Sequence, residues 1–330
     1  MHTNQQTILV VGGAGYIGSH MVLALREAGF HVVVLDNLSK GHARAVLDAE
    51  LIVGDMGDPA VLDRIFTQYT ILGVMHFASF IEVGESVRLP AKYYQNNLAA
   101  TLNLLDAMLK HDVKTFIFSS TAAVYGEPQY TPIDEKHPLA PINPYGRSKW
   151  MVEEILKDYA HSDGLRFASL RYFNAAGADP QGRLGECHEP ESHLIPLVLQ
   201  VALGQRDEIN VYGSNYPTPD GTCLRDYVHI ADLCQAHLLA LQQLMAGEKQ
   251  IICNLGTGKG FSVQEVIEVA RQVTGHAIPV KQIERRPGDP AILVANASTA
   301  LNLLGWQPVF GELETIISHA WFFMQQKVKN

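Results

Sequence analysis

The sequence predicts an α/β protein with a doubly wound parallel sheet and a smaller, interleaved C-terminal domain. Three observations favour this fold. Short apolar runs of strand length alternate with segments of helical periodicity through the first half of the chain. A glycine-rich turn directly follows the first of these runs. After Asn174 the chain changes to loops rich in glycine, proline and aspartate.

The elements of the first half follow one another in βαβ order. The expected strands are residues 7–12, 31–36, 51–53, 73–77, 114–119 and 166–172. The expected helices between them are residues 16–28, 60–68, 90–110 and 145–161. Parallel strands need crossover connections of a dozen or more residues, usually helical, so this alternation predicts a parallel sheet with helices on both faces.

The second half is expected to form a smaller domain. Helical periodicity occurs at residues 195–204, 230–245, 262–274 and 311–326. Residues 251–255 (IICNL) are strand-like and are expected to return to the first sheet. The chain is therefore divided into residues 1–180 and 181–330, with an interleaved boundary.

The composition restricts the class of protein. The chain has 330 residues, 47% apolar and 18% charged, which excludes a disordered chain or a disulfide-stapled miniprotein. Its 25 basic and 34 acidic residues give a formal net charge of −9. Nucleic acids and anionic membranes attract positively charged partners, so neither is expected as a partner.

Cellular location and metal content are also expected from local patterns. No apolar stretch reaches the roughly 20 residues of a membrane helix, and residues 1–7 are polar, so we expect a cytoplasmic protein. The four cysteines form no C-x-x-C pair, and the histidines are not clustered in the sequence. Cys187 and His188 are neighbours, but two adjacent ligands do not make a metal site, and none is expected.

The glycine-rich turn spans residues 12–18 (GGAGYIG) and satisfies both the G-x-G-x-x-G and the G-x-x-G-x-x-G spacing. Such glycines allow backbone amides at a helix N-terminus to approach a pyrophosphate. Taken alone, the pattern also fits an ordinary turn packed against a helix. The strand expected before it and the helix expected after it favour a Rossmann-type dinucleotide site.

Two aspartates follow later strands of the expected sheet. Asp36 ends the second strand, where an acid hydrogen-bonds the ribose 2′-hydroxyl and repels a 2′-phosphate. We therefore expect NAD rather than NADP. Asp55 follows the third strand and is a candidate for the adenine edge, or else an ordinary turn or helix-capping aspartate.

A candidate catalytic set lies farther along the chain. Tyr145 and Lys149 are four residues apart in an expected helix, so their side chains share one face. A nearby ammonium stabilises a phenolate and lowers the pKa of the tyrosine, although the same spacing also occurs by chance on surface helices. Thr121 follows the fifth strand, at the carboxyl edge where open α/β sheets bind ligands. Together the three are expected to move protons during oxidation of an alcohol over a nicotinamide.

Many segments in order resemble the extended short-chain dehydrogenase/reductase superfamily, and within it the family of UDP-glucose 4-epimerases, along nearly the whole chain. The matching segments are GGAGYIGSH (12–20), VLDNLSKG (34–41), HFA (76–78), VGES (83–86), SSTAAVYG (119–126), PYGRSK (144–149), RYFNAAGA (171–178), TCLRDYVHIADL (222–233), NLGTGKGFSV (254–263) and RRPGD (285–289).

The resemblance implies which residues bind the cofactor and the substrate. For NAD it implies Gly12, Gly15, Tyr16, Ile17, Gly18, Asp36, Asn37, Leu38, Ser39, Lys40, Gly41, Asp55, Met56, Phe77, Ala78, Ser79, Phe80, Ile81, Asn96, Thr121, Tyr145, Lys149 and Phe173. For the nucleotide sugar it implies Thr121, Tyr145, Asn174, His193, Leu194, Asn210, Val211, Tyr212, Arg225, Arg286, Pro287, Gly288, Asp289 and Leu293. It implies no metal ligand.

Three positions depart from the pattern of some relatives. Ile81 stands where some have a lysine beside the cofactor, which predicts weaker NAD retention. Thr121 stands where many have serine and keeps the hydroxyl. His193 stands where some have asparagine. Arg225 and Arg286 suit a diphosphate clamp, although each also fits a surface ion pair, for example with Asp226.

The resemblance implies reversible epimerisation at C4 of UDP-galactose and UDP-glucose through a 4-keto sugar, with Tyr145 as the base. Residues 1–180 would form the NAD domain and 181–330 the nucleotide-sugar domain. A homodimer through residues 90–110 and 145–161 is also implied. Two other functions were weighed: a nucleotide-sugar dehydratase or decarboxylase of the same fold, and a non-catalytic NAD-binding regulator. Ala122 and Ala123 stand where a 4,6-dehydratase carries its Asp-Glu pair, and the intact catalytic set argues against the regulator.

Overall fold

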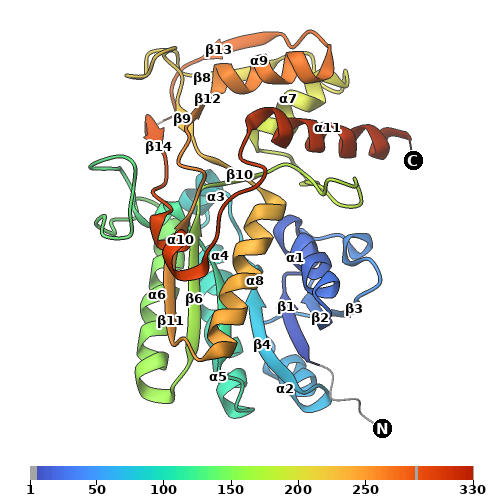
Figure 1. Cartoon of the computed structure of the whole chain (residues 1–330), viewed down its shortest axis with the longest axis vertical. Helices are drawn as coiled ribbons and strands as arrows, with labels where there is room; N and C mark the ends of the chain where they lie inside the picture. The colour runs from blue at the N-terminus through green and yellow to red at the C-terminus, as the bar shows by residue number, and fades with distance from the viewer. Residues whose placement is uncertain (1–5, 287–288, 330) are drawn as a thin grey trace.

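A computed structural model describes residues 6–286 and 289–329 (Figure 1). Its central feature is a seven-stranded sheet in the order β11-β6-β5-β4-β1-β2-β3. The strands are β1 (Thr7–Val11), β2 (His31–Asp36), β3 (Glu50–Val53), β4 (Ile71–His76), β5 (Thr115–Thr121), β6 (Arg166–Tyr172) and β11 (Gln250–Leu255). All neighbours pair in parallel. The predicted doubly wound sheet is confirmed.

Helices cover both faces of this sheet because its strands bury side chains on both sides. In β1, Ile8 and Val10 pack into one core, and Leu9 and Val11 pack into the other. The first face carries α1 (Tyr16–Glu27), α8 (Ile230–Ala246) and α10 (Ser298–Leu304). The second face carries α2 (Pro59–Gln68), α5 (Ala100–Lys110) and α6 (Pro144–Asp163). Strands β2 and β3 are added on one side of β1, and β4 and the later strands are added on the other side. Folds of this kind bind ligands at the point between β1 and β4 where the strand order reverses.

The start of α6 follows from the local sequence. The Asn143 side chain accepts a hydrogen bond from the Gly146 amide at 2.8 Å, and Pro144 occupies the first helical position. The helix ends at Gly164, which adopts a left-handed conformation with φ of 71°. These caps place Tyr145 in the first turn of the helix, at the carboxyl edge of the sheet.

Residues 90–110 were predicted as one α-helix, but the structure differs in the middle. Helix α4 (Pro90–Tyr93) leads into a π-helical turn, η2 (Tyr94–Ala99), which continues into α5. The π turn buries Asn97, whose side chain accepts a hydrogen bond from the Phe80 amide at 2.9 Å and donates one to the Phe80 carbonyl at 3.0 Å. A π turn often marks a functional position, and this one anchors the loop after β4.

A second core lies above the sheet in Figure 1. Its main elements are α7 (Leu194–Ala202), β8 (Ile209–Tyr212), α9 (Val263–Thr274), β13 (Val280–Ile283) and α11 (Leu313–Lys329). Short strands join it to the sheet region: β7 (Asn174–Ala176), β9 (Leu224–Arg225), β10 (Tyr227–His229), β12 (Phe261–Ser262) and β14 (Ile292–Leu293). Remaining short helices are η1 (Ala43–Val46), α3 (Val83–Arg88) and η3 (Ala122–Val124).

Segments after residue 180 return to the first core more than the sequence suggested. Strand β11 pairs with β6, and α8 packs against α1 although it was expected in the second domain. Trp306 is buried in the same core and donates a hydrogen bond to the Asp232 carbonyl at 2.9 Å. The division at residue 180 therefore stays a proposal about function, because the core packing crosses it.

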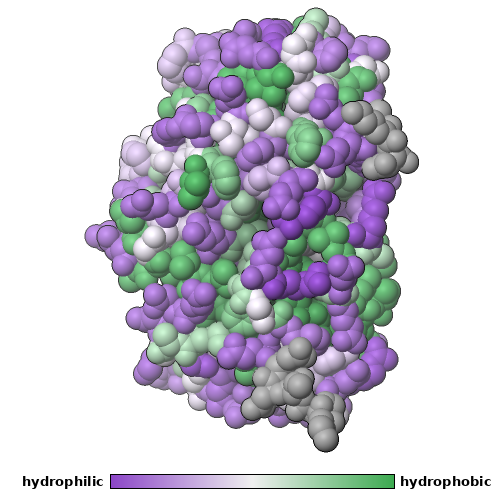
Figure 2. All heavy atoms as spheres, turned by 45° about the vertical axis from the view of Figure 1, so that its right-hand side comes forward, coloured by the Kyte–Doolittle hydropathy of each residue, from purple (hydrophilic) through white to green (hydrophobic). Residues whose placement is uncertain are grey.

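The surface carries no broad apolar region on the face shown in Figure 2, where apolar side chains lie in scattered groups between hydrophilic ones. Among the described residues, none of the helices combines the length and the apolar character required for a membrane span.

Candidate active site

A cleft of about 460 Å³ lies at the carboxyl edge of the central sheet. The glycine-rich turn and the ends of β2, β4, β5 and β6 line one part of it. The start of α7, together with Arg225 and Leu293, lines the other. The cleft thus joins the two cores at the point where the strand order reverses.

The geometry of the glycine-rich turn fits a dinucleotide. Gly12 has φ of +82°, and a Cβ there would lie 2.5 Å from the Ala78 amide nitrogen. A Cβ on Gly18 would lie 2.1 Å from the Gly12 carbonyl oxygen. Helix α1 begins directly after Gly15, and the residues of its first turn line the cleft. Because this turn contains no acidic residue, the free backbone amides of the helix N-terminus can bind an anion.

Asp36 lies in the lining of the cleft, as expected, and also holds the surrounding backbone. Its carboxylate accepts hydrogen bonds from the Ala14 amide at 2.9 Å and from the Leu38 amide at 2.8 Å. A carboxylate has about four acceptor positions, so two remain for ribose hydroxyls. The same carboxylate therefore shapes the glycine-rich turn, and its contact with the adenosine ribose stays a prediction.

Asp55 and Leu38 lie beside the cleft and not in its lining. Asp55 accepts hydrogen bonds from the Gly57 amide at 2.7 Å and from the Asn37 side chain at 3.0 Å. This is the geometry of a turn aspartate, the plainer of the two interpretations that the sequence left open. Its contact with the adenine stays a prediction.

The loop after β4 forms another wall. The lining includes Phe77, Ala78, Ser79, Phe80, Ile81 and Asn96. The Asn96 side chain donates a hydrogen bond to the Ala78 carbonyl at 3.2 Å, which with the Asn97 contacts fixes the loop. Ile81 lies at the edge of this wall, and its side chain is 41% exposed. Because isoleucine carries no charge, this position offers the cofactor no charged contact.

The three candidate catalytic side chains come together inside the cleft. Thr121 ends β5, and its hydroxyl shares a hydrogen bond with the Tyr145 phenol. Lys149 lies one turn after Tyr145 and is 1% exposed. Its ammonium donates hydrogen bonds to the Ser79 hydroxyl at 2.8 Å and to the Ser119 carbonyl at 2.7 Å.

The electrostatics of this set are governed by burial. Burial lowers the pKa of Lys149 to about 7, and the nearby Glu153 carboxylate acts in the opposite direction. Burial raises the pKa of Tyr145, and the hydrogen bond with Thr121 opposes this rise. Lowering of the Tyr145 pKa by Lys149 stays a prediction for the protein with cofactor and substrate bound.

Replacing Lys149 with alanine is expected to reduce both the rate and the affinity for NAD. A lost hydrogen bond to a charged group costs about 1.5–3 kcal/mol, or roughly 10- to 150-fold. Lys149→Met keeps the buried stem and separates the loss of charge from the loss of packing. Steady-state kinetics with an NAD titration check this, and a normal NAD affinity in both variants contradicts it.

The other end of the cleft holds several residues expected to bind the nucleotide sugar. Asn174, His193, Leu194, Arg225 and Leu293 all line it, and so does Phe173, which was expected to contact NAD. Arg225 forms an ion pair with Asp289, not with its neighbour Asp226. Asp226 is instead buried and accepts hydrogen bonds from the backbone of Thr257 and Ala295.

Some predicted nucleotide-sugar residues lie outside the lining of the cleft. Asn210, Val211 and Tyr212 form β8, which pairs with β13. The Arg286 guanidinium lies 3.8 Å from the centroid of the Tyr212 ring. Pro287 and Gly288 lie outside the described residues.

Several lining residues were missed by sequence reasoning. Ser119 and Tyr172 lie at the carboxyl ends of β5 and β6, and their hydroxyls are hydrogen-bonded to each other. The rule that ligands bind at these strand ends was sufficient to find them. Glu186 and His188 come from the irregular loop before α7, where no local signal indicated a place in the cleft.

Comparison with known proteins agrees with this geometry. Residues 8–256 match the model of the NAD dependent epimerase/dehydratase family. A UDP-glucose 4-epimerase from Halalkalibacterium halodurans is 55% identical over 314 residues, which is 95% of this chain and 94% of that protein.

Solved structures are similar over nearly the whole chain. The UDP-glucose 4-epimerase from Brucella ovis, in complex with NAD, has a TM-score of 0.94 and 47% identity, covering 96% of this chain and 98% of that one. The enzyme from Bifidobacterium longum, in complex with NAD+ and UDP, has a TM-score of 0.92 and 39% identity, covering 98% and 99%.

Proposed function

Because the chain belongs to the NAD dependent epimerase/dehydratase family, we propose that it interconverts UDP-galactose and UDP-glucose by epimerisation at C4, with NAD as its cofactor. The observation that supports this most directly is the convergence of Thr121, Tyr145 and Lys149 in the cleft that also holds the glycine-rich turn. Relatives crystallised with NAD and UDP have the same fold over nearly the full chain.

The residues of the cleft divide the chemistry between them. The Tyr145 phenolate takes the proton of the sugar 4-hydroxyl, directly or through the Thr121 hydroxyl, and later returns it. Bound NAD would supply the acceptor and the donor of the C4 hydride, so no redox equivalent would be consumed. Lys149, held by Ser79 and Ser119, is the residue that would bind the nicotinamide ribose. The 4-keto sugar stays tethered by its UDP and turns over before it is reduced on its other face.

The two cores are proposed to hold different ligands. Residues 1–180 hold the cofactor, and residues 181–330 hold most of the nucleotide sugar, with β11 and α8 returning to the first core. Arg225 and Arg286 are proposed to contact the diphosphate by charged hydrogen bonds. The Arg225–Asp289 ion pair would open to admit it.

The test is to incubate the purified protein with UDP-galactose, both without and with added NAD, and to follow the products by NMR. Formation of UDP-glucose until the two sugars reach equilibrium supports the proposal. A 4-keto-6-deoxy sugar would indicate a dehydratase, and an absence of any conversion would favour a binding protein. Ala122 and Ala123, neither of which carries an acid or base, follow Thr121 in η3 and lead us to expect the first result.

Cofactor choice gives a prediction at Asp36. The wild-type protein is expected to prefer NAD, because the carboxylate repels a 2′-phosphate. Asp36→Asn is expected to weaken NAD binding by roughly 10- to 150-fold, the value of a hydrogen bond to a charged group, and to reduce the discrimination against NADP. Titration of the apoprotein with both cofactors measures this. Asp48→Asn, at an exposed carboxylate, is the matched control. Equal affinities for NAD and NADP in the wild type would overturn the assignment.

Substrate breadth gives a prediction at Leu293. This side chain lines the cleft and is also packed against the small core around Val124 and Ile133. UDP-galactose is expected to be the better substrate and UDP-N-acetylgalactosamine at most slow. Leu293→Tyr is expected to remove activity on the acetamido sugar, and Leu293→Ala to enhance it, by about 10- to 200-fold in discrimination. An unchanged kcat/KM ratio with a lower Tm would show a packing role only.

We further infer a homodimer in the cytoplasm, with the helices of residues 90–110 and 145–161 at its interface. Val87 and Leu89, which precede α4, are 63% and 50% exposed and lie next to this proposed interface in the sequence. Light scattering tests this: twice the chain mass of 36.3 kDa supports the dimer, and the mass of one chain contradicts it.

A further inference from the structure

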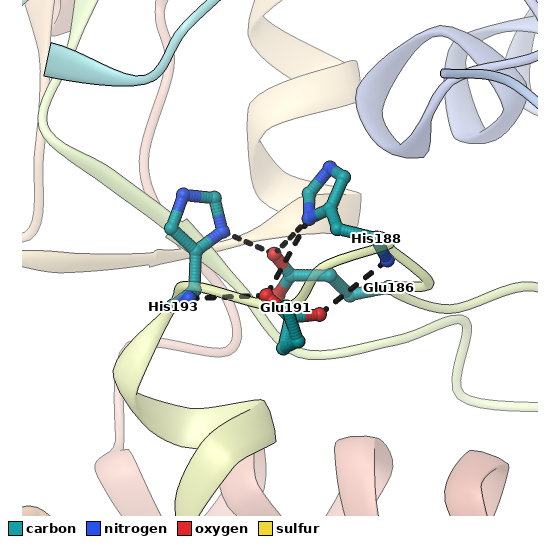
Figure 3. Close-up of side chains that lie close together, drawn as sticks. All are labelled: Glu186, His188, Glu191 and His193. Atoms are coloured by element: carbon teal, nitrogen blue, oxygen red, sulfur yellow. Dashed lines mark hydrogen bonds and ion pairs between the residues drawn. The ribbon is translucent and has the colours of Figure 1, made fainter. Parts of the chain in front are cut away.

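Four side chains in the loop before α7 converge on one point at the edge of the cleft, outside the glycine-rich turn and the candidate catalytic set, and one of them, His193, is also a predicted nucleotide-sugar residue. They are Glu186, His188, Glu191 and His193, and Figure 3 shows their carboxylates and imidazoles turned toward one another. One ligand atom from each lies within 4.8 Å of the other three. The expectation of no metal site rested on the absence of a C-x-x-C pair, on histidines that do not cluster in the sequence and on the isolated neighbours Cys187 and His188, whereas this cluster combines two histidines with two glutamates and does not include Cys187.

Burial makes this cluster different from an ordinary surface group of charges. The Glu186 and Glu191 side chains are each 6% exposed, that of His188 is 21% exposed, and that of His193 is 42% exposed. Two carboxylates removed from water need positive charge beside them. Imidazolium N–H groups supply it when no ion is present, and a divalent cation bound to neutral imidazoles supplies the same charge.

The distances suit a small tetrahedral ion. The His188 Nδ1 atom lies 3.1 Å from a Glu186 oxygen and 3.6 Å from a Glu191 oxygen. Bonds of about 2.0–2.2 Å to a tetrahedral zinc ion place neighbouring ligand atoms about 3.3 Å apart. The His193 Nδ1 atom is in direct hydrogen-bond contact with Glu186 and needs only to separate from it. We propose that these four residues form a structural Zn²⁺ site with two imidazole and two carboxylate ligands.

The surrounding contacts orient the ligands in advance. The Glu191 carboxylate accepts hydrogen bonds from the Ser192 amide at 2.8 Å and the His193 amide at 3.0 Å. The loop is also tied to the segment after β2, since the His42 ring lies 3.0 Å from the Cys187 carbonyl. Such outer contacts orient metal ligands and raise affinity. Because all four positions of the ion are filled by protein, it would brace the loop and not activate water.

The experiment measures Zn²⁺ binding directly, with no substrate present. The full-length protein is dialysed against a chelator, then titrated with Zn²⁺ by equilibrium dialysis while its Tm is recorded. One equivalent of bound Zn²⁺ per chain and a rise in Tm are expected, because a ligand that binds only the folded state stabilises it. Co²⁺ in place of Zn²⁺ is expected to give the intense visible absorption of a tetrahedral site.

Variants locate the site. His188→Gln and the nearly isosteric Glu186→Gln are each expected to weaken Zn²⁺ binding by at least about 10- to 100-fold. His161→Gln, at an exposed histidine of α6, is the matched control and is expected to bind as the wild type does. Circular dichroism of the chelated variants shows whether they are folded, and Glu186→Gln serves if His188→Gln is not. Binding of less than one equivalent, or binding that both cluster variants retain, would overturn the site while leaving the epimerase proposal untouched.

Discussion

Replacing Tyr145 with phenylalanine is expected to lower kcat by about 10²- to 10⁴-fold, which is the usual contribution of a positioned acid–base group. The hydroxyl of the phenol is the only part removed, and it is the group that shares a hydrogen bond with Thr121. Tyr145 is 9% exposed, and phenylalanine fills nearly the same volume, so packing is preserved. Dissociation constants for NAD and UDP are therefore expected to stay close to those of the wild type.

The measurement pairs steady-state kinetics on UDP-galactose with titrations of NAD and UDP. Tyr172→Phe is the matched control, because it removes another tyrosine hydroxyl from the same cleft, one hydrogen-bonded to Ser119. Its loss of kcat is expected to be much smaller. A near-normal rate in Tyr145→Phe would show that the base lies elsewhere, and a matching loss in Tyr172→Phe would show a general effect of polarity in the cleft.

Replacing Glu153 with alanine is expected to destabilise the protein by about 3–5 kcal/mol, the usual cost of breaking a buried ion pair by removing one partner. Glu153 is fully buried on α6. It accepts hydrogen bonds from Arg171 at 3.0 Å and from the Ser120 hydroxyl at 2.5 Å. Without it the Arg171 guanidinium stays buried and charged, with Tyr125 as its remaining hydrogen-bond partner.

Urea unfolding followed by circular dichroism measures this loss. Glu154→Ala is the matched control on the next residue, where the side chain is half exposed and paired with Lys157 at 2.6 Å. Exposed pairs contribute about 0–1 kcal/mol, so the control is expected to change little. The double variant Glu153→Ala with Arg171→Met is expected to recover part of the stability, because it removes the unpaired charge. Equal losses at residues 153 and 154 would contradict a role for the buried pair.

Much of the fold could be predicted because its signals are local. Strands buried on both faces are continuous apolar runs, as in β1 and β5, and helices such as α6 carry their own caps. The glycine-rich turn is recognisable because its glycines pack against the backbone of residues nearby in the sequence. Gly18, for example, lies so close to the Gly12 carbonyl that no side chain fits there. Tyr145 and Lys149 share a face of one helix, so their proximity also follows from spacing alone.

The π turn at residues 94–99 could not be predicted from periodicity. Its pattern of apolar residues fits an uninterrupted α-helix, and the extra residue in the turn is stabilised by Asn97 binding the backbone of Phe80. That partner comes from the loop after β4, so the feature depends on how the helix docks against the sheet. Helices α8 and α10 also lie in the first core because of tertiary packing: α8 packs against α1, and α10 packs against β11.

The sequence by itself therefore determined the parallel sheet, the dinucleotide turn and the positions of Thr121, Tyr145 and Lys149, because each depends on neighbours within a few residues or on a strand end. Tertiary structure alone decided which groups those residues face. It placed the Lys149 ammonium on Ser79 and Ser119, paired Arg225 with Asp289, and turned four side chains of residues 186–193 toward one point. These contacts join segments with no common periodicity, and their energies depend on burial, which exists only once both cores are folded.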